Sequence, residues 1–290
     1  MRRVAVFGTF DDLKSADVRF LEEAAKLGEV TAVIRDDDGV RARTGKPPKF
    51  PAEERRYVVG ALRSVGRAVI APAQKESGDF PFDVLSLEGA AGASPEMTPD
   101  IRAVREKVDR PEIRELYRPR GGKVVLIPDD SLLGFPGPPP FLAASDLPAP
   151  PDISRKKAIV TGCYDWLHSG HVRFFEEASA YGDLYVDVGS DANIRLLKGE
   201  GHPLFPQAER LYMVRAVRFV CRAFIGTGTG WMDAAPEIEI IRPDYYVVNE
   251  DGDRPEKREF CAARGIKYVV LRRLPARGLP PRDSTTLRGF

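Results

Sequence analysis

Short apolar runs alternate with longer amphipathic stretches along most of the chain. Val4–Phe7 and Ala158–Thr161 are apolar runs of the length expected of buried strands. An amphipathic stretch follows each of them, at Val18–Leu27 and at Val172–Tyr181, and a glycine stands directly after each stretch. Because glycine often ends a helix, both stretches are predicted to be helices.

The same alternation continues to the end of the chain. Further strands are predicted at Leu184–Val188, Tyr245–Val248 and Tyr268–Leu271, and a longer helix at Ala208–Val220. Alternating strands and helices imply a mostly parallel sheet with helices on both faces. The predicted fold class is therefore α/β, with Rossmann-like parallel sheets. Ligands of such sheets bind at the carboxyl ends of the strands, where the strand order reverses.

The chain also repeats its own pattern. A shift of 154 positions places Gly8–Gly28 on Gly162–Gly182, where 11 of 21 residues are identical. A shift of 155 positions places Pro48–Val65 on Pro203–Val220, with 10 identities in 18 positions. Because the two blocks come in the same order, we interpret the chain as a tandem repeat of one domain.

A proline-rich segment separates the two copies. Seven of the 17 residues from 135 to 151 are proline, a composition that favours an extended, semi-rigid spacer. We predict a first domain at residues 1–134, a linker at 135–154 and a second domain at 155–290. The two domains are expected to pack against each other as an internal pseudo-dimer.

Composition narrows the class of function. The 290 residues are 43% hydrophobic, enough to form buried cores. The formal net charge is +1, so nucleic acid is not an expected partner. Three cysteines without a spacing pattern predict neither a disulfide framework nor a zinc site. No apolar run approaches the roughly 18 residues of a membrane span, and we expect a cytoplasmic protein.

Candidate chemistry gathers in the second copy. Of the three histidines in the chain, two form His168-Ser-Gly-His171, between a predicted strand and a predicted helix. The first turn of a helix offers unpaired backbone N–H groups and a positive dipole end, both of which suit phosphate. Gly170 lets a phosphate approach the backbone closely. The two imidazoles, one turn apart, can donate to phosphate oxygens. The alternative is that both are ordinary surface histidines, but their place between a predicted strand and a predicted helix favours the phosphate site.

Two motifs carry a family resemblance. The run from Gly162 to His171, Gly-Cys-Tyr-Asp-Trp-Leu-His-Ser-Gly-His, resembles the signature of the cytidylyltransferase-like nucleotidyltransferase superfamily. Ser284-Thr-Thr286 resembles a second motif of that superfamily, and Arg218-Phe-Val220 is similar to the Arg-Tyr-Val segment of its cytidylyl-transferring branch. The resemblance covers the second copy and is to phosphoethanolamine and glycerol-3-phosphate cytidylyltransferases in particular.

The resemblance implies a role for each matching residue. His168 and His171 would hold the phosphates of a nucleoside triphosphate, and Lys198 would close over them. Arg210 would approach the phosphorylated acceptor. Asp165 would lie beside the phosphates and the metal ion, which would be Mg²⁺. The implied nucleotide-binding residues are Gly162, Cys163, Tyr164, Asp165, Gly170, Asn249, Ser284, Thr285 and Thr286.

These implications lead to an expected function. The second domain would transfer CMP from CTP to a small phosphorylated alcohol and release pyrophosphate. No protein nucleophile is required, because the phosphate of the acceptor attacks directly and preorganised donors stabilise the charge that develops. Two alternatives stay open: an adenylyltransferase that uses ATP, and a sensor that binds nucleotide without turnover.

Several positions depart from the family pattern. Cys163 stands where threonine or serine is usual, and we interpret it as a packing residue rather than a reactive thiol. The segment Ala276–Asp283 replaces a run that contains a family arginine, so the matching arginine is not fixed. Asn249–Arg254 is either a base or acceptor contact or an acidic surface turn. The glycine-rich segment Gly226–Gly230 is not expected to form a phosphate site of its own.

The first copy has lost the motif. Lys14-Ser-Ala-Asp17 stands in place of the two histidines and their glycine, and Asp17 would direct a negative charge to where phosphates would lie. We therefore predict a degenerate nucleotidyltransferase-like domain that binds no triphosphate and serves as a scaffold. The alternative is a different anion bound through Arg55 and Lys46.

Overall fold

The computed structural model describes residues 1–71, 99–108, 123–136 and 155–287. The chain divides into two compact units, Met1–Gly134 and Phe135–Phe290. Most of the predicted linker, residues 137–154, lies outside the described residues. How the two units pack against one another stays a prediction.

The first unit is built on a five-stranded parallel sheet with the strand order β3-β2-β1-β4-β5. Its strands are β1 (Arg3–Gly8), β2 (Glu29–Arg35), β3 (Arg67–Ala71), β4 (Ile101–Arg105) and β5 (Lys123–Ile127). Its described helices are α1 (Ser15–Ala25), α2 (Asp37–Thr44) and α3 (Ala52–Gly60), with short 3-10 turns η2 (Glu106–Val108) and η4 (Asp129–Leu132).

The second unit repeats this architecture with the order β8-β7-β6-β9-β10, again parallel throughout. Its strands are β6 (Lys157–Gly162), β7 (Asp183–Val188), β8 (Arg222–Ile225), β9 (Tyr245–Asn249) and β10 (Lys267–Leu271). The helices are α6 (Ser169–Ser179), α7 (Asp191–Lys198), α8 (Gln207–Ala216), α9 (Ala235–Ile241), α10 (Pro255–Ala263) and α11 (Ser284–Leu287), with 3-10 turns η6 (Gly230–Met232) and η7 (Glu250–Gly252).

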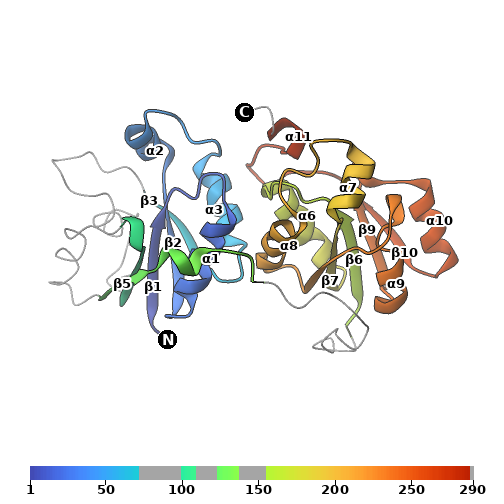
Figure 1. Ribbon diagram of the computed structural model, residues 1–290, viewed down its shortest axis with the longest axis horizontal. Helices are drawn as coiled ribbons and strands as arrows, with labels where there is room; N and C mark the ends of the chain where they lie inside the picture. The colour runs from blue at the N-terminus through green and yellow to red at the C-terminus, as the bar shows by residue number, and fades with distance from the viewer. Residues whose placement is uncertain (72–98, 109–122, 137–154, 288–290) are drawn as a thin grey trace. The chain divides into compact units, whose positions relative to one another are not determined.

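The predicted α/β class is confirmed, since each unit carries a parallel sheet with helices. In the second unit α6 and α8 lie on one side of the sheet, and α9 and α10 lie on the other (Figure 1). The two sheets share one strand order, in which the first strand of the unit is central. A common order is what a duplicated domain requires, although duplication itself stays a prediction.

The core of the second unit lies against its central strands. Every residue of β7 is buried, and α6 contributes the buried side chains of Val172, Phe174 and Phe175. Complete burial of a side chain such as that of Phe175 contributes about 1.5–3 kcal/mol. The packing fixes the start of α6 at the carboxyl end of β6, where the histidine motif lies.

One predicted helix is longer than the real one. The helix expected at Ala208–Val220 ends at Ala216, and the backbone of Val217 is already extended. Val217 and Val220 are nevertheless fully buried. The apolar pattern continues past the helix because the turn that leads into β8 also supplies core residues. A prediction from the apolar pattern alone therefore placed the end of the helix too late. In the described ranges, no helix is long and apolar enough to cross a membrane.

Candidate functional site

The histidine motif lies between the end of β6 and the first turn of α6. His168 is the N-cap residue of α6, and its Nδ1 accepts a hydrogen bond from the backbone N–H of Gly170 at 3.1 Å. A nitrogen that accepts carries no proton, so the proton of the neutral ring is on Nε2. His168 therefore caps the helix with one nitrogen and presents a donor with the other.

The two imidazoles are stacked. Their ring centroids are 3.9 Å apart with an interplanar angle of 23°, and the Tyr164 ring meets the His171 ring edge-on at 5.4 Å. The Nε2 atom of His168 and the Nδ1 atom of His171 are buried without a hydrogen-bond partner in the described structure. A buried polar atom without a partner is costly, so a ligand with acceptor oxygens would satisfy the Nε2–H of His168.

Both histidines are held in the neutral form. Burial lowers the pKa of His168 to about 3, and the positive charge of Arg273 acts in the same direction. Burial also lowers the pKa of His171 well below 6.5, helped by the adjacent His168 ring, Arg273 and Lys198. Arg282 also lowers the pKa of His168, whereas the carboxylate of Asp283 raises it. The three cations near the histidine pair outnumber this carboxylate, which favours an anionic ligand.

Two glycines of the motif are required by sterics. A Cβ atom on Gly170 would lie 2.9 Å from Cε1 of His168 and 3.2 Å from the carbonyl oxygen of Arg282. A Cβ atom on Gly162 would lie 2.8 Å from the ring of Tyr164. Gly170 therefore allows the segment before α11 to approach the start of α6. This approach brings the Ser284-Thr-Thr286 motif near the His168–His171 motif.

Other sequence-predicted residues lie at the same end of the sheet. Lys198 is exposed and ends α7, before Gly199 with a positive φ of 86°. Asn249 is half-buried and ends β9. Ser284 begins α11, but the side chains of Thr285 and Thr286 lie outside the described residues.

Asp165 does not face an open phosphate site. Its carboxylate is buried, and its two oxygens accept the backbone N–H groups of Leu204 at 2.8 Å and Phe205 at 2.9 Å. Among the described residues, no group of three or more His, Cys, Asp or Glu side chains is placed to hold a metal ion. The contacts of Asp165 thus differ from the metal-binding role that the resemblance implied.

The side chain of Arg210 is likewise buried, with 1% exposed. Its Nε donates to the carbonyl of Phe205 at 3.0 Å, and Nη1 donates to that of Cys163 at 2.6 Å. Nη2 donates to the carbonyl of Gly189 at 2.8 Å and to the carboxylate of Asp191 at 2.7 Å. All three guanidinium nitrogens therefore bind protein oxygens, in place of the implied contact with an acceptor.

Cys163 has the environment of a packing residue. Burial raises the pKa of its thiol, despite the charges of Lys198 and Arg210 nearby. A raised pKa keeps sulfur in the unreactive thiol form, which favours packing over nucleophilic chemistry.

A buried acidic group near the site was missed from the sequence. Asp187 of β7 is fully buried near Asp233, Glu237 and the ammonium of Lys257. Burial raises the pKa of Asp187 well above 3.8, and the charges of Asp233 and Glu237 raise it further. The available signal was a single acidic residue inside the apolar run predicted at Leu184–Val188.

Two neighbours of Asp187, Glu237 and Asp233, bind the glycine-rich segment Gly226–Gly230. Glu237 accepts the backbone N–H of Thr227 at 3.0 Å and its hydroxyl at 2.7 Å. The N–H of Gly228 donates to the carbonyl of Asp233, and that of Gly230 donates to Asn193 at 2.7 Å. These amides therefore donate to protein oxygens in the structure.

The comparisons with known proteins agree on the family. The model of the family described as cytidylyltransferase-like matches residues 159–280. A protein named FAD synthase from Methanocella arvoryzae is 32% identical over 136 residues, which cover 46% of this chain and 93% of the relative. FAD synthase from Ferroglobus placidus is 38% identical over 120 residues, 40% of this chain and 75% of the relative.

A shorter match has a different name. The bifunctional protein HldE of Geobacter metallireducens is 47% identical over 64 residues, which cover 22% of this chain and 13% of that protein. Because the match covers so little of that protein, it supports no inference about the substrate of this chain.

The expected transfer of CMP from CTP to a small phosphorylated alcohol is wrong. The relatives that match over most of their own length are named FAD synthase, which supports the ATP alternative instead. The Arg218-Phe-Val220 segment misled because it belongs to the turn between α8 and β8, where Val220 is a core residue. The first copy has Arg63-Ser-Val65 at the same place, so the segment follows the fold and not the nucleotide.

Motif, fold and relatives converge on one assignment. The His168–His171 pair opens α6 at the end of the central strand, and the matched family spans most of the unit around it. A relative is 32% identical to this chain and is covered over 93% of its length. Through its second unit, this chain belongs to the cytidylyltransferase-like family of nucleotidyltransferases.

Proposed function

We propose that the second unit is an adenylyltransferase that transfers AMP from ATP to FMN, forming FAD and releasing pyrophosphate. The observation that carries the proposal is the neutral histidine pair at the start of α6, with the Nε2–H of His168 unpartnered. The choice of ATP and FMN rests on the relatives named FAD synthase, one of which is covered over 93% of its length.

The reaction needs no covalent intermediate on the protein. An oxygen of the FMN phosphate attacks the α-phosphorus of ATP, and the bond between that phosphorus and the oxygen bridging to the β-phosphorus breaks. Pyrophosphate leaves with the electron pair of that bond. The Nε2–H of His168 would donate to a phosphate oxygen, and Lys198, Arg273 and Arg282 would offset the negative charge.

Mg²⁺ is proposed to enter with the triphosphate, whose oxygens and bound water would supply its ligands. The donor set of the described residues fits this role better than a resident metal site. Both oxygens of Asp165 already accept backbone N–H groups, and no cluster of metal-ligating side chains stands in the described ranges. When bound, the ion would neutralise charge on the leaving pyrophosphate.

The test is a matrix of the four nucleoside triphosphates against FMN, phosphoethanolamine and glycerol 3-phosphate, with the full-length protein and Mg²⁺. Pyrophosphate release and the nucleotide product are both measured. FAD is expected from ATP with FMN and from no other pair. Product from a different pair would refute the substrates. A melting-temperature rise with ATP but no pyrophosphate from any pair would support the non-catalytic sensor instead.

A further inference from the structure

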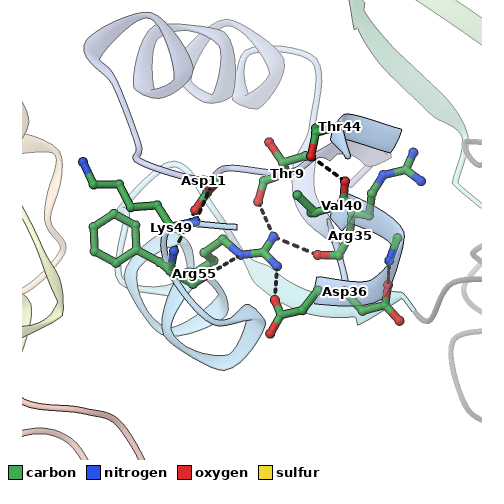
Figure 2. A network of polar contacts seen from close by, with 11 residues as sticks. Thr9, Asp11, Arg35, Asp36, Val40, Thr44, Lys49 and Arg55 are labelled. Carbon is green, nitrogen blue, oxygen red and sulfur yellow. Dashed lines mark hydrogen bonds and ion pairs between the residues drawn. The ribbon is translucent and has the colours of Figure 1, made fainter. Parts of the chain in front are cut away.

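The buried arginine of α8 has a counterpart in the first unit that makes the same contacts. Nε of Arg55 donates to the carbonyl of Phe50 at 2.9 Å, and Nη1 donates to those of Thr9 at 2.6 Å and Arg35 at 2.8 Å. Its Nη2 pairs with the carboxylate of Asp37 at 2.6 Å. Figure 2 shows this guanidinium at the centre of the four acceptors.

Arg210 repeats this pattern on acceptors 154 or 155 positions later in the chain. It bonds the carbonyls of Phe205, Cys163 and Gly189 and the carboxylate of Asp191, at 2.6–3.0 Å. Both arginines are fully buried, with 2% and 1% of their surface exposed. The whole set of contacts is thus present twice, once in each unit.

An aspartate completes each set. Asp11 accepts the backbone N–H groups of Lys49 at 2.8 Å and Phe50 at 2.9 Å (Figure 2). Asp165 accepts those of Leu204 and Phe205 at the same two distances. In each unit the arginine and the aspartate therefore join the loop after the first strand to the loop before the helix that bears the arginine.

The first unit is a natural control for what these residues do. It has Lys14 and Asp17 where the second unit has His168 and His171. The aspartate–arginine contacts nevertheless stay the same within a few tenths of an ångström. Their geometry therefore does not depend on the histidine pair.

We propose that Asp165 and Arg210 are positioning residues that set the place of Lys198 beside the histidine pair, and that neither contacts substrate. Arg210 holds the first turn of α7 through Asp191, and Lys198 is the last residue of that helix. Asp165 holds the far end of the following loop through Leu204. The segment that carries Lys198 is thus anchored on both sides to the strand end that carries the histidine motif.

The physical reason lies in the fork of the guanidinium. A buried arginine can donate to several carbonyls in one plane, whereas lysine offers a single point charge. If it is removed, buried carbonyls lose their donor and the two loops lose their link. A shift of about 1 Å in a catalytic group can lower a rate on the order of 100-fold, so the effect would reach the reaction through Lys198.

A double-mutant cycle in the full-length protein tests this proposal, which rests on the proposed adenylyl transfer. Arg210→Met is expected to lower kcat roughly 10- to 100-fold while leaving KM for FMN unchanged. The double variant Arg210→Met, Lys198→Ala should have a kcat close to that of Lys198→Ala alone, because both changes remove the same contribution, that of Lys198. A direct acceptor contact predicts a raised KM for FMN and additive losses, and either result would overturn the proposal.

Arg55→Met is the matched control. It removes the same four contacts from the first unit and should lower the melting temperature without changing kcat. Asp165→Asn, which keeps one acceptor oxygen, serves if Arg210→Met does not fold, and should likewise lower kcat at constant KM.

Amide hydrogen exchange provides a readout independent of turnover. Arg210→Met and Asp165→Asn should each speed exchange at Leu204 and Phe205, whereas Arg55→Met should do so at Lys49 and Phe50. Unchanged protection at these amides would refute the anchoring role. If the wild type released no pyrophosphate with any substrate pair, the proposed function would be wrong. Amide exchange at Leu204 and Phe205 would still test whether Asp165 and Arg210 anchor this loop.

Discussion

The rings of His168 and His171 lie face to face, with their centroids 3.9 Å apart. Two imidazolium cations would repel each other at this distance, so the stack requires that at least one ring is neutral. Burial and the cations around the pair lower the pKa of each ring. We therefore expect the site to bind anions through neutral donors, with positive charge supplied by residues further out, such as Arg273.

Replacement of His168 by alanine should sharply lower turnover. The change removes the Nε2–H donor and the acceptor that caps Gly170. Loss of one preorganised donor typically lowers kcat about 100- to 1,000-fold, or about 2.7–4 kcal/mol. Steady-state pyrophosphate release measures the effect. Lys14→Ala, at the matching position of α1, is the control and should keep wild-type kinetics; equal rates for all three proteins would contradict the assignment.

The buried His168 should also affect stability at acidic pH. Its folded pKa of about 3 is below the unfolded value near 6.5, so only the unfolded chain takes up a proton between these values. The stability that neutral His168 contributes is therefore complete above about pH 6.5 and is lost progressively as the pH falls toward 3. His168→Ala should reduce this slope, measured by urea unfolding between pH 7.5 and pH 5. The same slope in both proteins would disprove the burial argument.

Asp187 should act in the opposite direction. Burial raises its folded pKa well above 3.8, so the unfolded chain loses the proton first as the pH rises. The folded state is therefore disfavoured progressively as the pH rises from about 4 toward the raised pKa. Asp187→Asn should raise the melting temperature at pH 7–8 and should do so less near pH 4. The first unit has a fully buried valine, Val33, at this position. A variant that is less stable than wild type at pH 8 would contradict the expectation.

The first unit should bind no triphosphate. Asp17 accepts the backbone N–H of Lys14 at 2.8 Å and the guanidinium of Arg105 at 2.5 Å. The chain thus places its own carboxylate at the start of α1, where the second unit presents His171. Calorimetry with ATP on the full-length protein should find one site per chain, and none in the His168→Ala, His171→Ala variant. A second site that Asp17→Ala alters would refute this.

The local sequence pattern was enough to predict the fold class, a domain boundary and the place of the candidate site. The alternation of apolar runs and amphipathic stretches was enough for the α/β class, because strand and helix periods are set by neighbouring residues. The internal repeat predicted a boundary near Gly134, and the run from Gly162 to His171 predicted where the site would lie. Of these inferences the α/β class is confirmed, because it depends on residues close together in the chain, whereas the domain bounds and the site residues stay predictions. The Arg218-Phe-Val220 segment failed as a guide to the nucleotide because it lies in a turn of the fold, where Val220 is a core residue.

Only the tertiary structure decided what the charged residues do. Arg273 lies 102 positions from His171, yet its charge lowers the pKa of that ring. The burial of Asp187 also depends on segments far apart in sequence, and three of the four partners of Arg210 lie 19 to 47 positions away from it. Burial and charge act through space, so a motif can identify an arginine but cannot say whether its guanidinium faces a substrate or is enclosed by backbone carbonyls.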